Sequence, residues 1–305
     1  MNSTQTPSML SLKVQIPFWI CTLIWGTTWI VILGQLGTVP PSWSVTYRFL
    51  TAGIAMFAYA LFTKAPLRIG REGQIFAIIF GIAQFVFNFN FVYRAEAYVT
   101  SGLVAVIFAL LIVPNTLFAR LFLGIKPTPR FYAGAAIAMA GIGLLFLKEY
   151  REAAKGSDAV LLGIGITMLG VLSASVANIM QATKRAATLP IASLLAWGMF
   201  WGTLFDALLA WATVGPPVIE PSFSYLGGVV YLGVAASAIA FMAYFSVIRM
   251  IGPGPAAYSS VIVPVIAMGI STVFEGYRWT LLAGAGGALA MAGLVIALTA
   301  RKPST

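Results

Sequence analysis

Amide and hydroxyl side chains recur at helical spacing within apolar stretches of the sequence. Gln84 and Asn88 are four residues apart, and Ser175, Asn178 and Gln181 follow one another at steps of three. Residues three or four apart share one face of a helix, and polar groups in hydrocarbon surroundings face a protein interior or water. These five side chains are therefore candidates to bind a solute in a central cavity. The alternative is hydrogen bonding that holds helices together.

Aromatic side chains alternate with these polar positions. A cavity with aromatic faces and amides but few charges suits a neutral or zwitterionic solute with an apolar body. The alternative is a place at the membrane surface, where Trp and Tyr gather. The aromatic candidates for a binding site are Trp25, Trp197, Trp201, Phe241, Tyr244 and Tyr258.

Three ionisable residues lie within apolar stretches or at their ends. Arg48 can hold the carboxylate of a solute or extend to the membrane surface, and we favour the second role. Asp206 lies well inside its stretch and is the candidate for proton coupling. Glu275 ends another stretch, where we expect a structural role.

The residue types also exclude several kinds of chemistry. The sequence has no His, which removes the commonest metal ligand, and no G-x-x-x-x-G-K-[ST] motif for nucleotides. Metal-dependent or serine-type enzymes that act on lipid need clusters of His, Asp, Glu or Lys, which no apolar stretch supplies. We expect no metal, no cofactor and no enzymatic activity, with an intramembrane lipid enzyme as a minor alternative.

The composition places these residues in a membrane. Of the 305 residues, 60% are hydrophobic and 9% are charged, against about 45–50% apolar and about 25% charged in soluble domains. A net charge of +10 would suggest nucleic acid in a soluble protein. Here the basic residues lie in short loops between apolar runs, where they set orientation. We therefore expect a multi-pass protein surrounded by lipid, with no nucleic-acid partner; the oligomeric state is left open.

Ten apolar stretches are long enough to cross a bilayer, whose core of about 30 Å needs roughly 20 residues of helix. An even number returns the chain to the side on which it starts. The excess of Lys and Arg in the loops on that side predicts that both termini are cytoplasmic. The predicted spans are 16–37, 44–63, 74–93, 99–119, 130–147, 159–181, 191–214, 225–248, 256–274 and 279–299.

The two halves of the sequence match when one is shifted by 150 residues. Ile112-Val113-Pro114 then meets Ile262-Val263-Pro264. We predict two repeats, 1–150 and 151–305, and because each has five spans, the second enters the membrane from the opposite side. The predicted fold is all-α, with ten transmembrane helices as two inverted five-helix repeats. Such symmetry places a substrate near the midplane between the halves and supports alternating access.

Prolines and glycines occupy particular places in these repeats. Pro114 and Pro264 each remove one helical hydrogen bond, which would leave the carbonyl of Leu110 or Ser260 without its usual partner. The resulting kinks are equally consistent with hinges and with fixed bends. The fifth and tenth spans are rich in glycine, which predicts close helix packing or a dimer surface away from the pore.

Several motifs resemble a known family. The run Leu23-Ile24-Trp25-Gly26-Thr27, Pro41 with Arg48, and the segment from Gly252 to Pro264 followed by Phe274-Glu275 are similar to signatures of the EamA-type ten-helix exporters of the drug/metabolite transporter superfamily. The aromatic content and amides resemble its aromatic amino-acid exporter branch. One departure is Ile125, which stands where the first half of such proteins usually carries an acid.

The resemblance and the repeat together predict a secondary transporter in a bacterial inner membrane. Its expected substrates are small neutral or zwitterionic solutes, amino acids including aromatic ones, which it would export by alternating access. Sugars, nucleosides and drugs are alternative substrates, and a channel with a continuous pore is an alternative mechanism. The net direction of transport and its coupling to protons are not fixed by the sequence.

Overall fold

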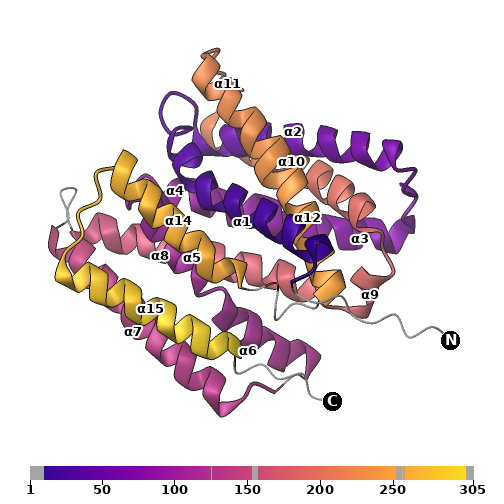
Figure 1. Ribbon diagram of the computed structural model, residues 1–305. Coiled ribbons are helices and arrows are strands. Elements are labelled where there is room, and N and C mark those ends of the chain that lie inside the picture. Colours follow the sequence, from indigo (N-terminus) through magenta and orange to yellow (C-terminus); the bar gives the residue numbers. More distant parts are fainter. Residues whose placement is uncertain (1–9, 125, 153–156, 252–255, 257, 300–305) are drawn as a thin grey trace.

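A computed structural model describes residues 10–124, 126–152, 157–251, 256 and 258–299. Helices dominate these residues, and long apolar helices lie side by side (Figure 1). The first half contains α1 (Leu12–Leu33), α2 (Pro41–Phe62), α3 (Gly70–Gly81) continued by η1 (Ile82–Phe87) and α4 (Asn88–Ala95), α5 (Ser101–Ala109), α6 (Ile112–Leu123) and α7 (Pro129–Glu152).

The second half repeats this arrangement. It contains α8 (Ser157–Gln181), the short α9 (Lys184–Ala187), α10 (Ile191–Val214), α11 (Phe223–Val230) continued by η2 (Tyr231–Ile239) and α12 (Ala240–Ile251), α14 (Ser259–Phe274) and α15 (Leu281–Thr299). We call the end of the bundle where α1 starts and α15 finishes the near end, and the opposite end the far end.

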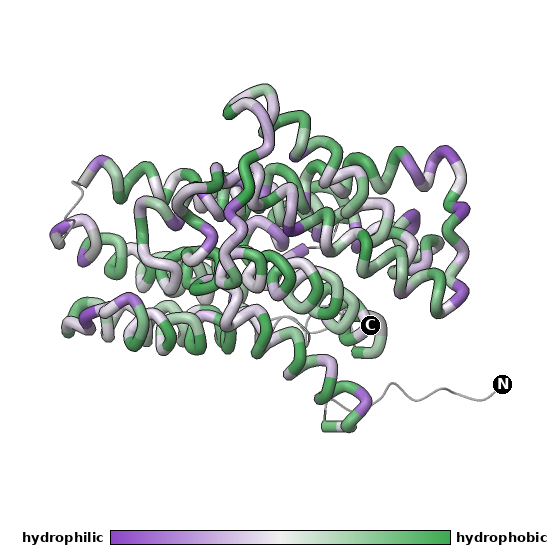
Figure 2. Tube along the Cα trace, turned by 90° about the horizontal axis from the view of Figure 1, so that it is seen from above, coloured by the Kyte–Doolittle hydropathy of each residue, from purple (hydrophilic) through white to green (hydrophobic). Residues whose placement is uncertain are grey.

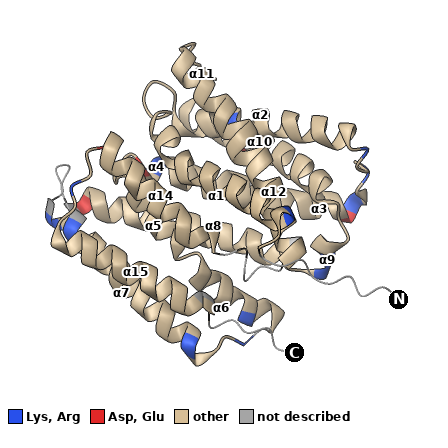
Figure 3. Ribbon diagram, viewed as in Figure 1, with Lys and Arg blue, Asp and Glu red and all other residues tan. Residues whose placement is uncertain are grey.

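The described residues form eight apolar segments long enough to cross a membrane and two shorter apolar helices, α14 and α15. This confirms the all-helical membrane fold with ten crossings. The boundaries differ by a few residues: the first span is 12–33 rather than 16–37, because the helix ends before Gly34 and Gly37. Figure 2 shows predominantly hydrophobic helices with hydrophilic residues at their ends and at a few interior places. Charged side chains also gather at helix ends and in connecting turns (Figure 3).

The helix neighbours show the inverted symmetry directly. The second span packs on the seventh, the fourth on the ninth and the fifth on the tenth, so each of these pairs joins a helix to its repeat partner. The first span packs on the eighth and ninth, and the sixth correspondingly packs on the third and fourth. A two-fold relation between the halves produces this set of contacts.

Three crossings depart from regular α-helix. The third and eighth spans contain π-helical segments, η1 and η2, at equivalent places in the two repeats. The fourth span breaks at Leu110 and Leu111, between α5 and α6. π-Helical turns are rare and occur frequently at functional sites. Residues of η1 and of the break line the cavity described below, and η2 ends just before Phe241, which also lines it.

The fifth and tenth spans form a seam of small residues, α7 against α15, along one edge of the bundle (Figure 1). A Cβ on Gly141 would collide with the backbone nitrogen of Ala290, and one on Gly293 with that of Ala138. The glycines therefore permit backbone-to-backbone approach. The expectation of close packing is confirmed, and the seam joins the two halves of one chain.

Candidate functional site

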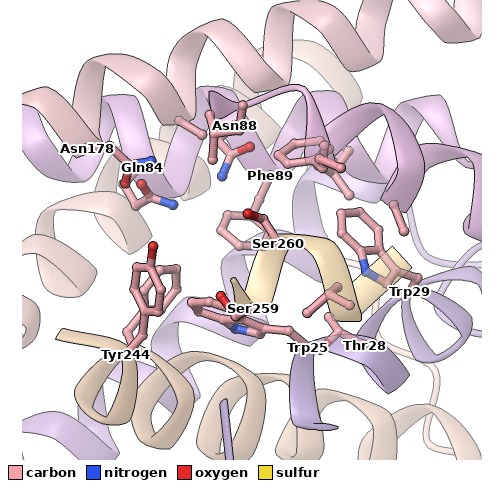
Figure 4. Close-up of a pocket in the computed structure, with 18 of the residues that line it drawn as sticks. Trp25, Thr28, Trp29, Gln84, Asn88, Phe89, Asn178, Tyr244, Ser259 and Ser260 are labelled. Atoms are coloured by element: carbon pink, nitrogen blue, oxygen red, sulfur yellow. The ribbon is translucent and has the colours of Figure 1, made fainter. Parts of the chain in front are cut away.

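A cavity of about 160 Å³ lies between the two halves. The first half contributes α1, α2, the η1–α4 segment and α5, and the second contributes α8, α12 and α14. Figure 4 shows amide side chains on one side of the space and aromatic rings with the α14 serines on the other. The helices of the seam, α7 and α15, contribute none of the described residues that line it.

Three of the five predicted polar residues meet in this cavity. Gln84 from η1, Asn88 from α4 and Asn178 from α8 all line it, and the hydroxyl of Tyr244 points toward Gln84 and Asn178 (Figure 4). Asn88 is 3% exposed, and its Oδ1 has no hydrogen-bond partner among the described residues. Ser175 and Gln181 do not line the cavity.

Three of the predicted aromatic residues, Trp25, Phe241 and Tyr244, line the cavity together. The Trp25 ring centroid lies 5.0 Å from that of Tyr244 and 5.4 Å from that of Phe241. The indole Nε1 of Trp25 donates a 3.1 Å hydrogen bond to the carbonyl of Ala236 in η2. This bond crosses from the first half to the second, so one residue both lines the cavity and links the halves.

Arg48 lies about two turns into α2 and is buried in the protein. Its side chain is 1% exposed, so the expected extension to the membrane surface is wrong. Its Nε donates a 3.0 Å hydrogen bond to Ser237 Oγ, and its guanidinium lies 4.2 Å from the ring centroid of Phe89. Nη1 has no partner within the described residues, and the residue lines the cavity.

The π-helical segment η2 supports this arginine. A serine hydroxyl in a regular α-helix bonds the carbonyl three or four residues back, but Ser237 Oγ donates a 2.8 Å hydrogen bond to the carbonyl of Leu232, five residues back. The same hydroxyl accepts the bond from Arg48 Nε. The wide turn thus places the Ser237 hydroxyl where it can donate to Leu232 and accept from Arg48 at the same time.

The remaining aromatic candidates lie elsewhere. Trp197 Nε1 donates 2.9 Å to the carbonyl of Leu67, and Trp201 Nε1 donates 2.8 Å to Gln74 Oε1, so both tie α10 to the region around α3. Tyr258 packs in apolar clusters that include Phe18 and Ile262. None of the three lines the cavity, and their predicted role in binding has no support from this geometry.

Asp206, the coupling candidate, is fully buried in α10. Its Oδ1 accepts a 2.7 Å hydrogen bond from Asn90 Nδ2, and Oδ2 has no partner among the described residues. The residue does not line the cavity. Its contact joins α10 to α4 across the halves, and a role in coupling stays a prediction.

The two aligned prolines have different surroundings. Pro114 stands in the first turn of α6, directly after the break, and the Leu110 carbonyl accepts a 2.8 Å hydrogen bond from Val113 N. This carbonyl thus accepts from the residue three positions on, in place of its usual partner at position 114. Pro264 lies within the continuous helix α14 and lines the cavity. Ile125 and Gly252 lie outside the described residues.

Sequence reasoning missed several residues of the cavity wall. These include Trp29, Phe89, Ser259 and Ser260. Trp29 follows Trp25 by four residues, so helical spacing alone could have placed it on the same face. Its indole Nε1 is buried without a partner in the described part of the chain. Within those same residues, no group of three His, Cys, Asp or Glu is placed to hold a metal ion.

Inverted halves around a mid-bundle cavity define a membrane carrier, and comparisons identify its class. The profile of the EamA-like transporter family matches residues 16–147 and again 161–299, once in each half. The chain belongs to the EamA-like transporter family, and it is a secondary transporter rather than an enzyme.

Relatives and a solved structure agree with this assignment. The chain is 26% identical to protein PagO of Salmonella typhimurium, over 88% of this chain and 87% of PagO. It is 29% identical to the uncharacterized inner membrane transporter YedA of Escherichia coli K12, over 83% and 80% of the two chains. A crystal structure at 20% identity, covering 96% of this chain and 99% of its own, matches with a TM-score of 0.71 and shows the same fold.

Proposed function

We propose that this transporter exports small neutral or zwitterionic solutes, amino acids including aromatic ones, by alternating access between its two halves. The observation that carries the proposal is the set of unpartnered polar atoms that belong to residues lining the cavity. Arg48 Nη1 and Trp29 Nε1 are donors, and Asn88 Oδ1 is an acceptor. Buried polar groups are costly without partners, and a bound solute would supply them.

These atoms suit the two charged groups of an amino acid. An arginine guanidinium, together with the indole N–H of Trp29, favours a carboxylate. The amide oxygen of Asn88 can accept from an ammonium group. The positive charge of Arg48 favours a carboxylate over a cationic group at this side of the cavity.

The aromatic wall suits an apolar or aromatic body. Trp25, Phe241 and Tyr244 present rings to the cavity, and aromatic pairs in offset or edge-to-face contact contribute about 0.5–1.5 kcal/mol beyond the burial of their area. The volume of about 160 Å³ is close to that of cavities that hold a benzene ring, about 150 Å³. This favours small solutes over large drugs.

Alternating access follows from how the halves meet. The cavity extends to Ser259 and Ser260 at the near-end start of α14, whereas at the far end Glu275 of the second half bonds Ser101 of the first. In an inverted repeat the mirrored arrangement is available to the same chain. If the far-end contact breaks and the near end closes, the cavity becomes accessible from the far end instead of the near end.

Counterflow in proteoliposomes tests the substrate class. Vesicles loaded with unlabelled L-phenylalanine should accumulate labelled L-phenylalanine transiently, and vesicles with the Arg48→Gln variant should accumulate much less. Exchange of a sugar, a nucleoside or a cationic drug without amino-acid exchange would overturn the amino-acid proposal while leaving the carrier fold intact. A flux that does not saturate and shows no counterflow would indicate a channel.

The proposed location is a bacterial inner membrane with both termini in the cytoplasm, so that the near end is cytoplasmic. YedA, a relative, is named an inner membrane transporter. Tyr150 is exposed at the far end of α7, and Arg185 lies in α9 at the near end. In intact cells an impermeant thiol reagent should label Tyr150→Cys and spare Arg185→Cys; the reverse pattern would invert the proposed orientation.

A further inference from the structure

A buried carboxyl group lies at the far end, where the two halves meet. Glu96 directly follows α4, is 3% exposed, and neither of its carboxylate oxygens has a hydrogen-bond partner in the described part of the chain. An ionised carboxylate without partners is strongly disfavoured away from water. Binding a proton removes this charge and so lowers the cost of burying the group.

The second half supplies a carboxylate beside it. Glu275 follows the last residue of α14, and its Oε1 accepts a 3.1 Å hydrogen bond from the backbone N–H of Ser101 while its Oε2 accepts from the Ser101 hydroxyl. Thr100, the N-cap residue of α5, makes no capping bond with its own side chain. Glu275, from the second half, therefore caps the N-terminus of α5. Helix N-termini favour negative charge.

Three titratable groups face Glu96 among the described residues. They are Glu275 from the end of α14, Arg48 from α2 and Tyr93 from α4. Burial raises the pKa of the Glu96 carboxyl well above its ordinary value, the Glu275 carboxylate raises it further, and the Arg48 guanidinium lowers it. Both carboxylate oxygens of Glu275 accept hydrogen bonds, whereas those of Glu96 have no partner within the described residues, so the proton is assigned to Glu96.

We propose that Glu96 is a proton-binding site whose occupancy holds the far end of the two halves closed. Opening of this end separates Glu275 from α5 and admits water to Glu96, which then releases its proton. This proton-binding site acts only at the far end, because the residues at the equivalent positions of the other repeat carry no charge. Ser246 corresponds to Glu96, Ile251 to Ser101 and Ile125 to Glu275.

The sign of the pH effect follows from linkage. Because the closed state has the higher Glu96 pKa, it binds the proton more tightly than the open state, and closure is favoured at low pH. As the pH rises from the ordinary glutamate value to the raised one, the open-to-closed ratio should increase about tenfold per pH unit. Above the raised value the ratio should level off.

Spin-label distances across the far end test this directly. Tyr98, in the turn after α4, is 36% exposed, and Phe223, at the start of α11, is 93% exposed. The variant Tyr98→Cys/Phe223→Cys, with the native Cys21→Ala, is labelled in lipid nanodiscs and measured between pH 5 and pH 9. The long-distance population should grow with pH, whereas the same protein with Glu96→Gln should show one distribution at every pH.

A pH response that is equal with and without Glu96→Gln, or a far end that stays closed up to pH 9, would overturn the proposal. If Glu96→Gln does not fold, Glu275→Gln serves as the second variant. It removes the neighbouring negative charge but keeps an oxygen to accept from Ser101 N–H. The ratio should then level off at a lower pH, and an unchanged profile would also overturn the proposal.

Discussion

The seam and the cavity both lie where the two halves of the chain meet, yet their surfaces are opposite in character. In the seam, backbone touches backbone through glycines such as Gly141 and Gly293, with no space for a side chain. In the cavity, large and partly exposed side chains such as Trp25 and Tyr244 line open space. Close contact along two helices fixes their relative position. Helices that surround an open space can change their relative position.

The difference indicates which parts of the carrier move. Small-residue contacts in membranes are stabilised by van der Waals packing that is lost when helices slide, so the seam is expected to hold the halves together during transport. The helices around the cavity carry the π-helical segments and the break of the fourth span. Substitutions in the seam should therefore affect stability, and those in the cavity should affect transport.

The largest effect is expected in the seam. Gly293→Ala places a methyl group against the backbone of Ala138, and overpacking of this kind costs typically about 1–3 kcal/mol. The variant should unfold at a lower temperature in detergent and yield less monodisperse protein. Gly143→Ala is the matched control, because nothing lies within 4 Å of its added Cβ. Equal melting temperatures for the two variants would contradict the prediction that a methyl group is destabilising only where the two backbones touch.

The second effect concerns the charge in the cavity. Arg48→Gln should lower counterflow of L-phenylalanine by about tenfold or more, since a charge-assisted hydrogen bond contributes roughly 1.5–3 kcal/mol. Arg48→Lys should restore little, because lysine lacks the planar fork that bonds Ser237 and a carboxylate together. Melting temperature and elution volume are the controls for folding. Unchanged transport in a folded Arg48→Gln protein would exclude the carboxylate role.

A smaller effect is expected at the aromatic and amide walls. Trp25→Ala and Asn178→Ala should each impair transport without abolishing membrane insertion, since each removes one contact among several. Trp201→Phe should leave transport unchanged, because its indole bonds Gln74 outside the cavity. Saturation curves for all three variants in proteoliposomes provide the comparison. Equal losses at Trp25 and Trp201 would mean that the cavity does not define the binding site.

The smallest effect is expected at the prolines. Pro114→Ala and Pro264→Ala should slow turnover more than they weaken substrate binding, because helices that bend are involved in opening. Pro114 should show the larger change, since it follows an actual break of the fourth span whereas Pro264 lies in a continuous helix. Parallel losses of affinity and rate would assign these residues to binding instead.

The fold was predictable because hydrocarbon imposes simple rules on sequence. Length and hydropathy determine ten crossings, and the aligned Ile-Val-Pro tripeptides reveal the repeat. The amides Gln84, Asn88 and Asn178 were also within reach, because polar groups in apolar helices face inward. The sequence could not separate Trp197 and Trp201 from Trp25, since all three are tryptophans within apolar spans. Their hydrogen-bond partners and their places relative to the cavity distinguish them.

Other features depend on tertiary contacts that no local pattern contains. The burial of Arg48 requires Ser237, which lies 189 residues away in the other half. The carboxyl of Glu96 is buried although it follows directly on a helix end, a place where solvent is the usual surrounding. The π-helical segments likewise have no composition that marks them. Long-range packing, rather than propensity, decides these positions.

The wide turns η1 and η2 also matter for comparing this carrier with its relatives. Each wide turn adds backbone to its span. One additional residue rotates the side chains that follow it by about 100° around the helix axis. Asn88 and Phe241 both lie just beyond such a turn. A relative with regular winding at either place would present neighbouring residues to its cargo, so alignments of cargo-facing positions hold only between chains that share both wide turns.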